Sequence, residues 1–244
     1  MPTAADVAEL IGARTGAGTP FIVGITGAVA VGKSTLAAAL EVTMRRYADA
    51  RGGERAVEVV CTDGFLYDNA TLAAQGLSQR KGFPESYDAE ALRRALASVR
   101  KGPTDFPAYS HIIYDVDPAL TRRIDPPHVL IVEGLGLQEP TAVGLDALVY
   151  LDADEDLLET WFTERFVGFW RAAESDPNSF YARFRSMDEA QTHAFAAQVW
   201  RNINLPNLRE HIVHARDHAD WVVHKGPGHV IEAITERPRS TSAG

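Results

Sequence analysis

The chain has 244 residues, of which 45% are hydrophobic, so it can bury a sizeable core and we expect one domain. A formal net charge of -9 with a pI near 5.4 argues against nucleic acid or an anionic membrane surface as the main partner, because each requires a basic face. The single cysteine, Cys61, excludes an intrachain disulfide and a metal site built from several thiolates.

The N-terminal residues contain no basic segment followed by an apolar run. No later stretch approaches the roughly 20 apolar residues of a membrane span, so we expect a cytoplasmic protein without a membrane partner. Residues 20–26 (PFIVGIT) predict a buried strand, and the run from residue 33 to 50, rich in Ala and Leu, predicts a helix.

The same alternation of strand and helix continues along the chain. Residues 56–62 predict a second strand, and residues 88–100 predict a helix after an irregular stretch. Residues 128–133 (HVLIVE) and 146–151 (DALVYL) are nearly continuous in apolar side chains. Runs of this kind are typical of parallel strands covered by helices on both faces, so the fold class is α/β with three layers.

The composition becomes aromatic and helical from about residue 154. A break at SDPNS (175–179) precedes a further predicted helix over about 179–203. We interpret residues 154–218 as a helical flap on the same domain, which then extends over residues 1–236. The tail 237–244 (RPRSTSAG) is predicted to be disordered.

A phosphate-binding motif stands between the first strand and the helix that follows it. Gly27, Gly32, Lys33 and Ser34 fit G-x-x-x-x-G-K-[ST], the motif of a P-loop NTPase fold. Its backbone N–H groups would surround phosphate oxygens, with Lys33 on the β and γ phosphates of ATP and the Ser34 hydroxyl on Mg²⁺. The predicted phosphate-binding residues are Gly27, Ala28, Val29, Ala30, Val31, Gly32, Lys33, Ser34 and Thr35.

Two carboxylates follow predicted strands directly. Asp63 comes after VEVVCT and Glu133 after HVLIV. Ligands of open parallel sheets bind beyond the carboxyl ends of the strands, so both acids are candidates for the same crevice as the phosphate loop. The alternative is that each only caps a loop or a helix.

One cationic side chain interrupts an apolar helix face. Leu158, Phe162, Arg165 and Phe169 share that face, and burying the guanidinium without a partner would be costly. A transferring phosphoryl group is a suitable partner, because Arg binds its oxygens in a fork. A side chain that reaches solvent, or one in a salt bridge, is the alternative.

Several stretches together resemble bacterial type I pantothenate kinase, in the phosphoribulokinase and uridine kinase group. They include GAVAVGKST, TDGFLYDN, RKGFPESYD, YSHIIYDV, IVEGLGLQ and INLPNL, in the family's order. The segments RKGFPESYD (80–88) and YSHIIYDV (109–116) carry the most specific resemblance. It implies phosphorylation of the primary hydroxyl of pantothenate by ATP and Mg²⁺, with a homodimer left open.

The resemblance also implies roles for individual residues. Asp63 would accept the hydroxyl proton or orient the hydroxyl, Lys33 and Arg165 would stabilise the phosphoryl group, and Ser34 and Glu133 would support Mg²⁺. His229 would lie near the adenine. The acceptor would be contacted by Asp63, Tyr109, His111, Phe162, Arg165, Phe169, Phe180, Phe184 and Asn204.

The sequence departs from the family pattern at three aromatic positions. Phe162, Phe180 and Phe184 stand where the family usually has tyrosines, and the one matching Phe162 normally bonds the acceptor's carboxylate. The site could therefore favour an acceptor without a free carboxylate, such as a pantetheine-like compound. A kinase of a sugar or nucleoside, and a non-catalytic nucleotide sensor, are the alternative functions.

Overall fold

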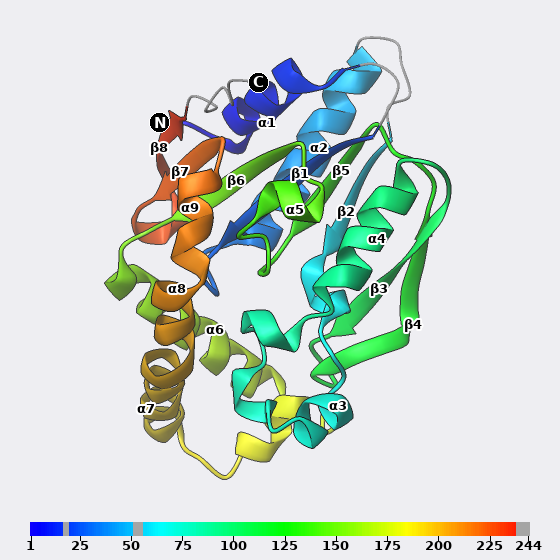
Figure 1. Cartoon of the computed structure of the whole chain (residues 1–244). Coiled ribbons are helices and arrows are strands. Elements are labelled where there is room, and N and C mark those ends of the chain that lie inside the picture. The colour runs from blue at the N-terminus through cyan, green and yellow to red at the C-terminus, as the bar shows by residue number, and fades with distance from the viewer. Residues whose placement is uncertain (17–19, 51–55, 238–244) are drawn as a thin grey trace.

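The computed structural model describes residues 1–16, 20–50 and 56–237. A six-stranded sheet in the order β2-β5-β1-β6-β7-β8 forms its centre (Figure 1). Its strands are β1 (Phe21–Gly27), β2 (Val57–Cys61), β5 (Val129–Glu133), β6 (Ala147–Asp152), β7 (Trp221–Lys225) and β8 (Ile231–Glu236). All neighbouring pairs are parallel except β7 with β8, which confirms the predicted α/β class with a mostly parallel sheet.

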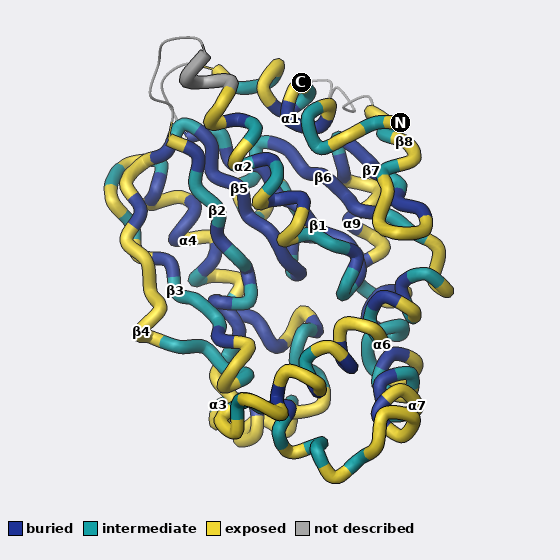
Figure 2. Tube along the Cα trace, turned by 180° about the vertical axis from the view of Figure 1, so that it is seen from behind, coloured by how far each residue is buried: buried dark blue, intermediate teal, exposed yellow. Residues whose placement is uncertain are grey.

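Helices cover the sheet and continue beyond its carboxyl end. α2 (Lys33–Ala50) packs on β1, β2 and β5, α1 (Ala4–Arg14) packs on α2, and α9 (Ala215–His218) packs on β1 and β6. The central strands are buried along their length, because helices cover them (Figure 2). The described helices also include α4 (Ala89–Val99), which packs on α5 (Pro140–Val143) and on β3 (Thr104–Ser110).

A second, two-stranded sheet lies beside α4. β3 pairs with β4 (Asp115–Ile124) in an antiparallel hairpin, which the sequence did not predict. The strand β4 shows no apolar alternation because most of its residues are exposed. The short helix α3 (Asn69–Ala74) lies near the tip of this hairpin (Figure 1).

The helical flap lies below the carboxyl ends of the parallel strands in Figure 1. It consists of α6 (Glu155–Ala172), α7 (Glu189–Val199) and α8 (Leu205–Glu210), and it has its own buried cluster, Phe166, Ala173, Tyr181 and Ala196. The helix predicted over about 179–203 is confirmed in its second part, by α7 and the π-helical turn after it, but its predicted start was wrong. Residues 180–184 form a 3₁₀ turn, and α7 begins only at residue 189 because Asp188 caps it in a capping box with Gln191.

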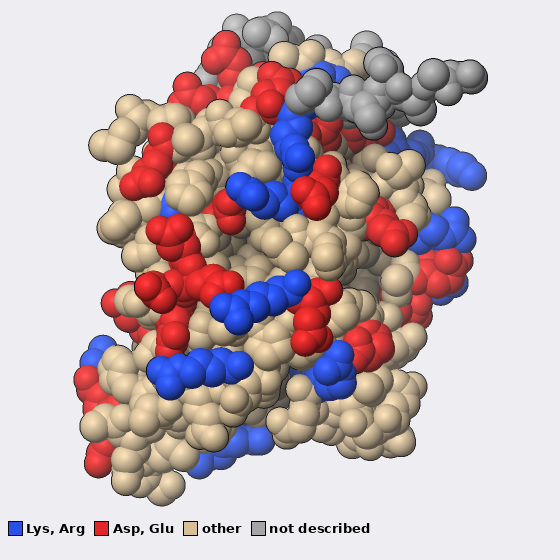
Figure 3. Space-filling model, turned by 60° about the vertical axis from the view of Figure 1, so that its left-hand side comes forward, with Lys and Arg blue, Asp and Glu red and all other residues tan. Residues whose placement is uncertain are grey.

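Charged side chains on the flap, and on α9 and the end of β6 beside it, form ion pairs. Arg201 pairs with Glu159, Arg209 with Glu155, and Arg216 with Asp152. Figure 3 accordingly shows acidic side chains interspersed with basic ones on this side of the molecule. Within the described residues, no helix is long and apolar enough to cross a membrane.

The C-terminal prediction falls partly outside the described residues. Positions 238–244 of the predicted tail lie outside them. Arg237, which was assigned to the tail, instead donates its backbone N–H to the carbonyl of Asp220 at 2.9 Å and its guanidinium to the carbonyl of Arg216. Arg237 follows the last strand directly, because β8 ends at Glu236.

Candidate active site

The phosphate loop joins β1 to α2 in a conformation that requires glycine at its first position. Gly27 has φ +141°, and a Cβ there would overlap the carbonyl oxygen of Leu151. Residue 27 therefore cannot carry a side chain while the loop keeps this shape. The Lys33 ammonium lies over the loop and donates to the carbonyl oxygens of Gly27 at 3.2 Å and Ala28 at 2.9 Å.

Two oxygen-bearing side chains meet at the start of α2. The Ser34 hydroxyl donates to Glu133 Oε1 at 2.9 Å, and Glu133 is buried at the end of β5. Burial lowers the pKa of Lys33, while the nearby charges of Glu133 and Asp63 act in the opposite direction. The two predicted carboxylates thus share one crevice with the loop lysine.

The hydroxyl and carboxylate pair fits Mg²⁺ better than a softer metal. Hard oxygen donors suit this ion, which keeps several waters and takes its other ligands from substrate phosphates. In the described part of the chain, no group of three or more His, Cys, Asp or Glu side chains could hold a metal without such help. Ser34 and Glu133, next to the phosphate loop, would be sufficient protein ligands for Mg²⁺ that is bound together with substrate phosphates.

Asp63 lies in the 3₁₀ turn Thr62–Phe65 that follows β2, and its carboxylate is bonded by a buried phenol. The Tyr87 hydroxyl donates to Asp63 Oδ1 at 3.0 Å. Burial, followed by the charge of Asp63, raises the pKa of Tyr87 well above its ordinary value, so Tyr87 stays a neutral donor. Tyr87 lies within the segment RKGFPESYD, and its bond to Asp63 was not predicted from the sequence.

Aromatic side chains from the hairpin and the flap surround the space beyond Asp63. Tyr109 meets His111 edge-on with ring centroids 5.3 Å apart, and His111 stacks on Phe169 at 6.3 Å. Phe180 stacks on Tyr114 at 4.1 Å. The structure therefore brings Tyr109, His111, Phe169 and Phe180 into one group, to which it adds Tyr114.

Arg165 lies on the same side of α6 as this group, but it is exposed rather than buried as the stripe suggested. Its guanidinium sits 5.3 Å from the centroid of Phe169 and has no acidic partner among the residues described. Burial, and then the charge of Arg165, lower the pKa of His111. The guanidinium is therefore free to bind an anionic ligand.

The remaining predicted acceptor residues are placed differently. Phe162 is half-buried against Trp200, with centroids 5.8 Å apart. Phe184 packs on Phe166 and Phe195 in the flap's own cluster, and it meets Phe180 edge-on with centroids 5.8 Å apart. Asn204 ends a π-helical turn between α7 and α8, where the chain continues into the next helix.

A histidine and a lysine lie on the other side of the phosphate loop. His229 stacks on Trp161 with centroids 3.9 Å apart. The buried Lys225 ammonium donates to the carbonyl of Val31 at 2.8 Å and lies 3.5 Å from His229 Nδ1. Sequence reasoning missed Lys225, because Val31 is 194 residues away in the chain.

A surface pocket lies beside the segment that follows Asp63. It has a volume of about 720 Å³ and is lined by α4, the hairpin and the segment after Asp63. No residue of the phosphate loop lines it. The pocket is therefore separate from the phosphate loop and from Lys33, Asp63 and Glu133.

A sequence model of the phosphoribulokinase and uridine kinase family matches residues 22–165, which include the phosphate loop, both carboxylates and Arg165. The chain belongs to this family. Its relatives include pantothenate kinases from Rhizobium rhizogenes, 41% identical over 90% of this chain and 69% of the relative, and from Lacticaseibacillus casei, 41% identical over 95% and 77%.

Solved structures share the fold of this phosphoribulokinase and uridine kinase family member. A candidate fructose transport system kinase from Silicibacter sp. TM1040 has a TM-score of 0.68 at 23% identity, covering 90% of this chain and 96% of the other. D-glycerate 3-kinase from Cryptococcus neoformans has a TM-score of 0.60 at 12% identity, covering 96% of each chain. At these identities the likeness concerns the fold.

Proposed function

We propose that this kinase transfers the γ-phosphate of ATP to the primary hydroxyl of pantothenate, giving 4'-phosphopantothenate for coenzyme A synthesis. The observation that carries the proposal is the identity of about 41% to pantothenate kinases over 90 to 95% of the chain. That span includes the segments 80–88 and 109–116, which form the space beyond Asp63.

In this proposal Asp63 accepts the proton of the attacking hydroxyl or orients it, and the bond from Tyr87 holds the carboxylate in position. Lys33 and Arg165 bind the transferring phosphoryl group from two sides, since its charge is spread over several oxygens. Ser34 and Glu133 would hold Mg²⁺, which neutralises phosphate charge when bound.

The acceptor would lie against the aromatic group of the hairpin and the flap. Tyr109 and His111 would contact it from the hairpin, and Phe169 and Asn204 from the flap. His229 would lie near the adenine, since it flanks the phosphate loop through Lys225 and Val31.

A second candidate function follows from Phe162. Its ring has no hydroxyl to donate to an acceptor carboxylate, and the missing bond to a charged group is worth about 1.5 to 3 kcal/mol. An acceptor without that carboxylate, such as pantetheine, loses nothing at this position. The alternative is therefore a kinase of the same family that prefers a pantetheine-like alcohol.

The test is ADP release from Mg-ATP with pantothenate, pantetheine, an N-alkyl pantothenamide, uridine and fructose as acceptors. Pantothenate turnover with a KM no worse than that for pantetheine supports the first proposal and excludes the second. Turnover of uridine or fructose alone contradicts both. ATP binding without turnover of any acceptor would indicate a nucleotide sensor.

A further inference from the structure

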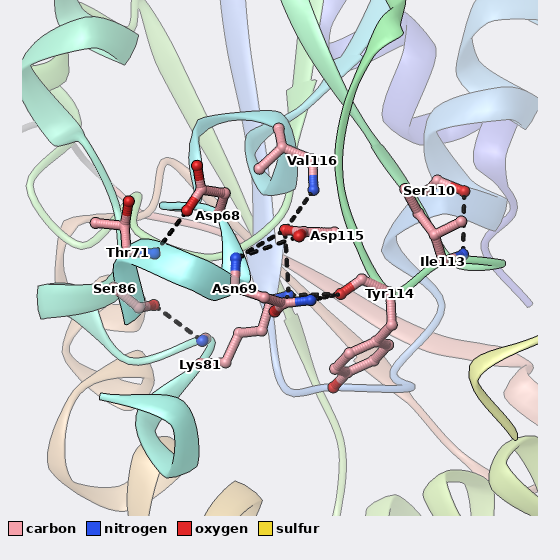
Figure 4. A network of polar contacts seen from close by, with 11 residues as sticks. Asp68, Asn69, Thr71, Lys81, Ser86, Ser110, Ile113, Tyr114, Asp115 and Val116 are labelled. Atoms are coloured by element: carbon pink, nitrogen blue, oxygen red, sulfur yellow. Dashed lines mark hydrogen bonds and ion pairs between the residues drawn. The ribbon is translucent and has the colours of Figure 1, made fainter. Parts of the chain in front are cut away.

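Lys81 is a half-buried cation with no role in the proposed chemistry. Its side chain is 10% exposed, and the nearest carboxylate oxygen, on Asp115, lies 4.0 Å away. The ammonium donates instead to Asn69 Oδ1 and to the carbonyl oxygen of Tyr114, both at 2.7 Å (Figure 4). It also lies 4.8 Å from the ring centroid of Tyr109 and 4.7 Å from that of Tyr114.

The backbone that Lys81 binds is strained. Tyr114 has φ +56°, a left-handed conformation that bulky residues adopt at a cost in free energy. Asn69 Nδ2 donates to the same carbonyl at 3.0 Å, and the Asn69 backbone N–H donates to Asp115 at 3.0 Å. Two donors on one carbonyl hold the hairpin turn in a shape it would not adopt alone.

This turn carries the aromatic group that faces Asp63. Tyr114 stacks on Phe180 of the flap, and Tyr109 meets Tyr114 edge-on with centroids 5.9 Å apart. The Phe180 backbone N–H donates to the carbonyl of Ile112 at 2.8 Å. A change at the Tyr114 turn would therefore move both tyrosines and the flap residue that packs on them.

The segment that contains Lys81 also reaches the catalytic carboxylate. Tyr87 bonds Asp63, and the carbonyl of Gly82 accepts a hydrogen bond from Asn207 Nδ2 of α8 at 2.8 Å. Residues 81–87 thus contact the base, the hairpin and the flap. Within this segment the Lys81 ammonium lies against the rings of Tyr109 and Tyr114.

We infer that Lys81 is a positioning residue that sets acceptor affinity, by fixing the Tyr114 turn and clamping Tyr109 and Tyr114 about its ammonium. This inference rests on the proposed function, because it takes the aromatic group to be the acceptor wall. Lys81 contacts no residue of the phosphate loop in the described structure, so its effect should spare ATP.

The test compares Lys81→Met and Lys81→Arg with the parent, and uses Lys101→Met as the control because Lys101 is exposed and lies outside this network. KM for the acceptor, KM for ATP, kcat and the thermal midpoint are measured for each. Lys81→Met keeps the apolar stem but removes the ammonium, so we expect the acceptor KM to rise about tenfold and the KM for ATP to stay within twofold. Lys81→Arg should recover part of the loss.

An unchanged acceptor KM in Lys81→Met overturns the inference, even if the thermal midpoint falls, because the role is then structural only. Equal rises in both KM values overturn it as well. Where Lys81→Met fails to fold, Asn69→Ala removes the other donor to Tyr114 and should raise the acceptor KM in the same direction. If the parent uses uridine or fructose, the proposed function fails, while the same comparison with that acceptor still tests Lys81.

Discussion

Replacing Tyr87 with Phe removes one hydroxyl from the site and leaves the ring in place. The lost contact is the 3.0 Å bond from a buried phenol to Asp63 Oδ1. Hydrogen bonds to charged groups contribute about 1.5 to 3 kcal/mol. If all of that energy holds the carboxylate toward the acceptor hydroxyl, kcat should fall by about 10 to 100-fold.

The assay is steady-state ADP release at saturating Mg-ATP and saturating acceptor, with KM for ATP measured alongside. Tyr67→Phe is the matched control, since Tyr67 lies in the same part of the fold and its hydroxyl has no hydrogen-bond partner among the described residues. Asp63→Asn sets the lower limit of activity. A Tyr87→Phe enzyme with kcat within twofold of the parent, beside an inactive Asp63→Asn, would refute the reasoning.

Four further changes test other parts of the structure. Phe162→Tyr should lower the KM for pantothenate about 10 to 100-fold, as one new bond to a charged group predicts, and an unchanged KM would contradict a carboxylate at that position. Arg165→Ala should reduce kcat about hundredfold with a much smaller change in KM for ATP, because a cation on the phosphoryl group acts in the transition state. A rise in KM for ATP as large as the fall in kcat would contradict this role. Gly134→Ala should lower the free energy of unfolding by more than the about 1 to 3 kcal/mol expected from the backbone conformation at φ +142°, because a Cβ there would also overlap the buried hydroxyl of Thr62. Urea unfolding measures the loss, and Gly76→Ala, at φ +71° with open space around it, should show the backbone cost alone. Burial and a neighbouring lysine lower the pKa of His229 from 6.5, so near that pH the unfolded chain binds a proton that the folded chain does not, and the folded state loses stability as pH falls below about 6.5. His229→Gln should therefore lose less stability than the parent between pH 7 and 5, and identical profiles of stability against pH would exclude the effect.

The central strands could be predicted from sequence, because strands that are buried on both faces consist of continuous apolar runs. Residues 129–133 are all buried, and the carboxylate that follows HVLIV is the one that bonds Ser34. The phosphate loop could also be predicted, because its glycines are needed for the local backbone conformation. Both features are determined by residues that are close together in the sequence.

The hairpin β3–β4 and the edge strand β8 could not be predicted in the same way. Their residues are mostly half-buried or exposed, so the side chains do not alternate between apolar and polar. The hairpin also contains Pro107 and Pro118, which weaken a strand pattern. Neighbouring residues carry too little apolar signal to mark these strands.

The contacts of the site that sequence reasoning missed join distant segments. Tyr87 reaches Asp63 across 24 residues, and Lys225 reaches Val31 across 194. Such pairs are set by how the chain folds back, which spacing within a motif does not encode. The exposure of Arg165 stayed open at the level of sequence for a related reason, because helical periodicity gives the face of a residue but not what covers that face.

Helix α6 sets the separation between two aromatic contacts, one to His229 and one to His111. Trp161 stacks on His229 in the first half of the helix, and Phe169 stacks on His111 and Tyr181 about two turns later. At 1.5 Å per residue these eight positions span about 12 Å. One inserted residue would turn the far end by about 100° and point Phe169 away from the hairpin, so the separation of the His229 and His111 contacts depends on the register of one helix.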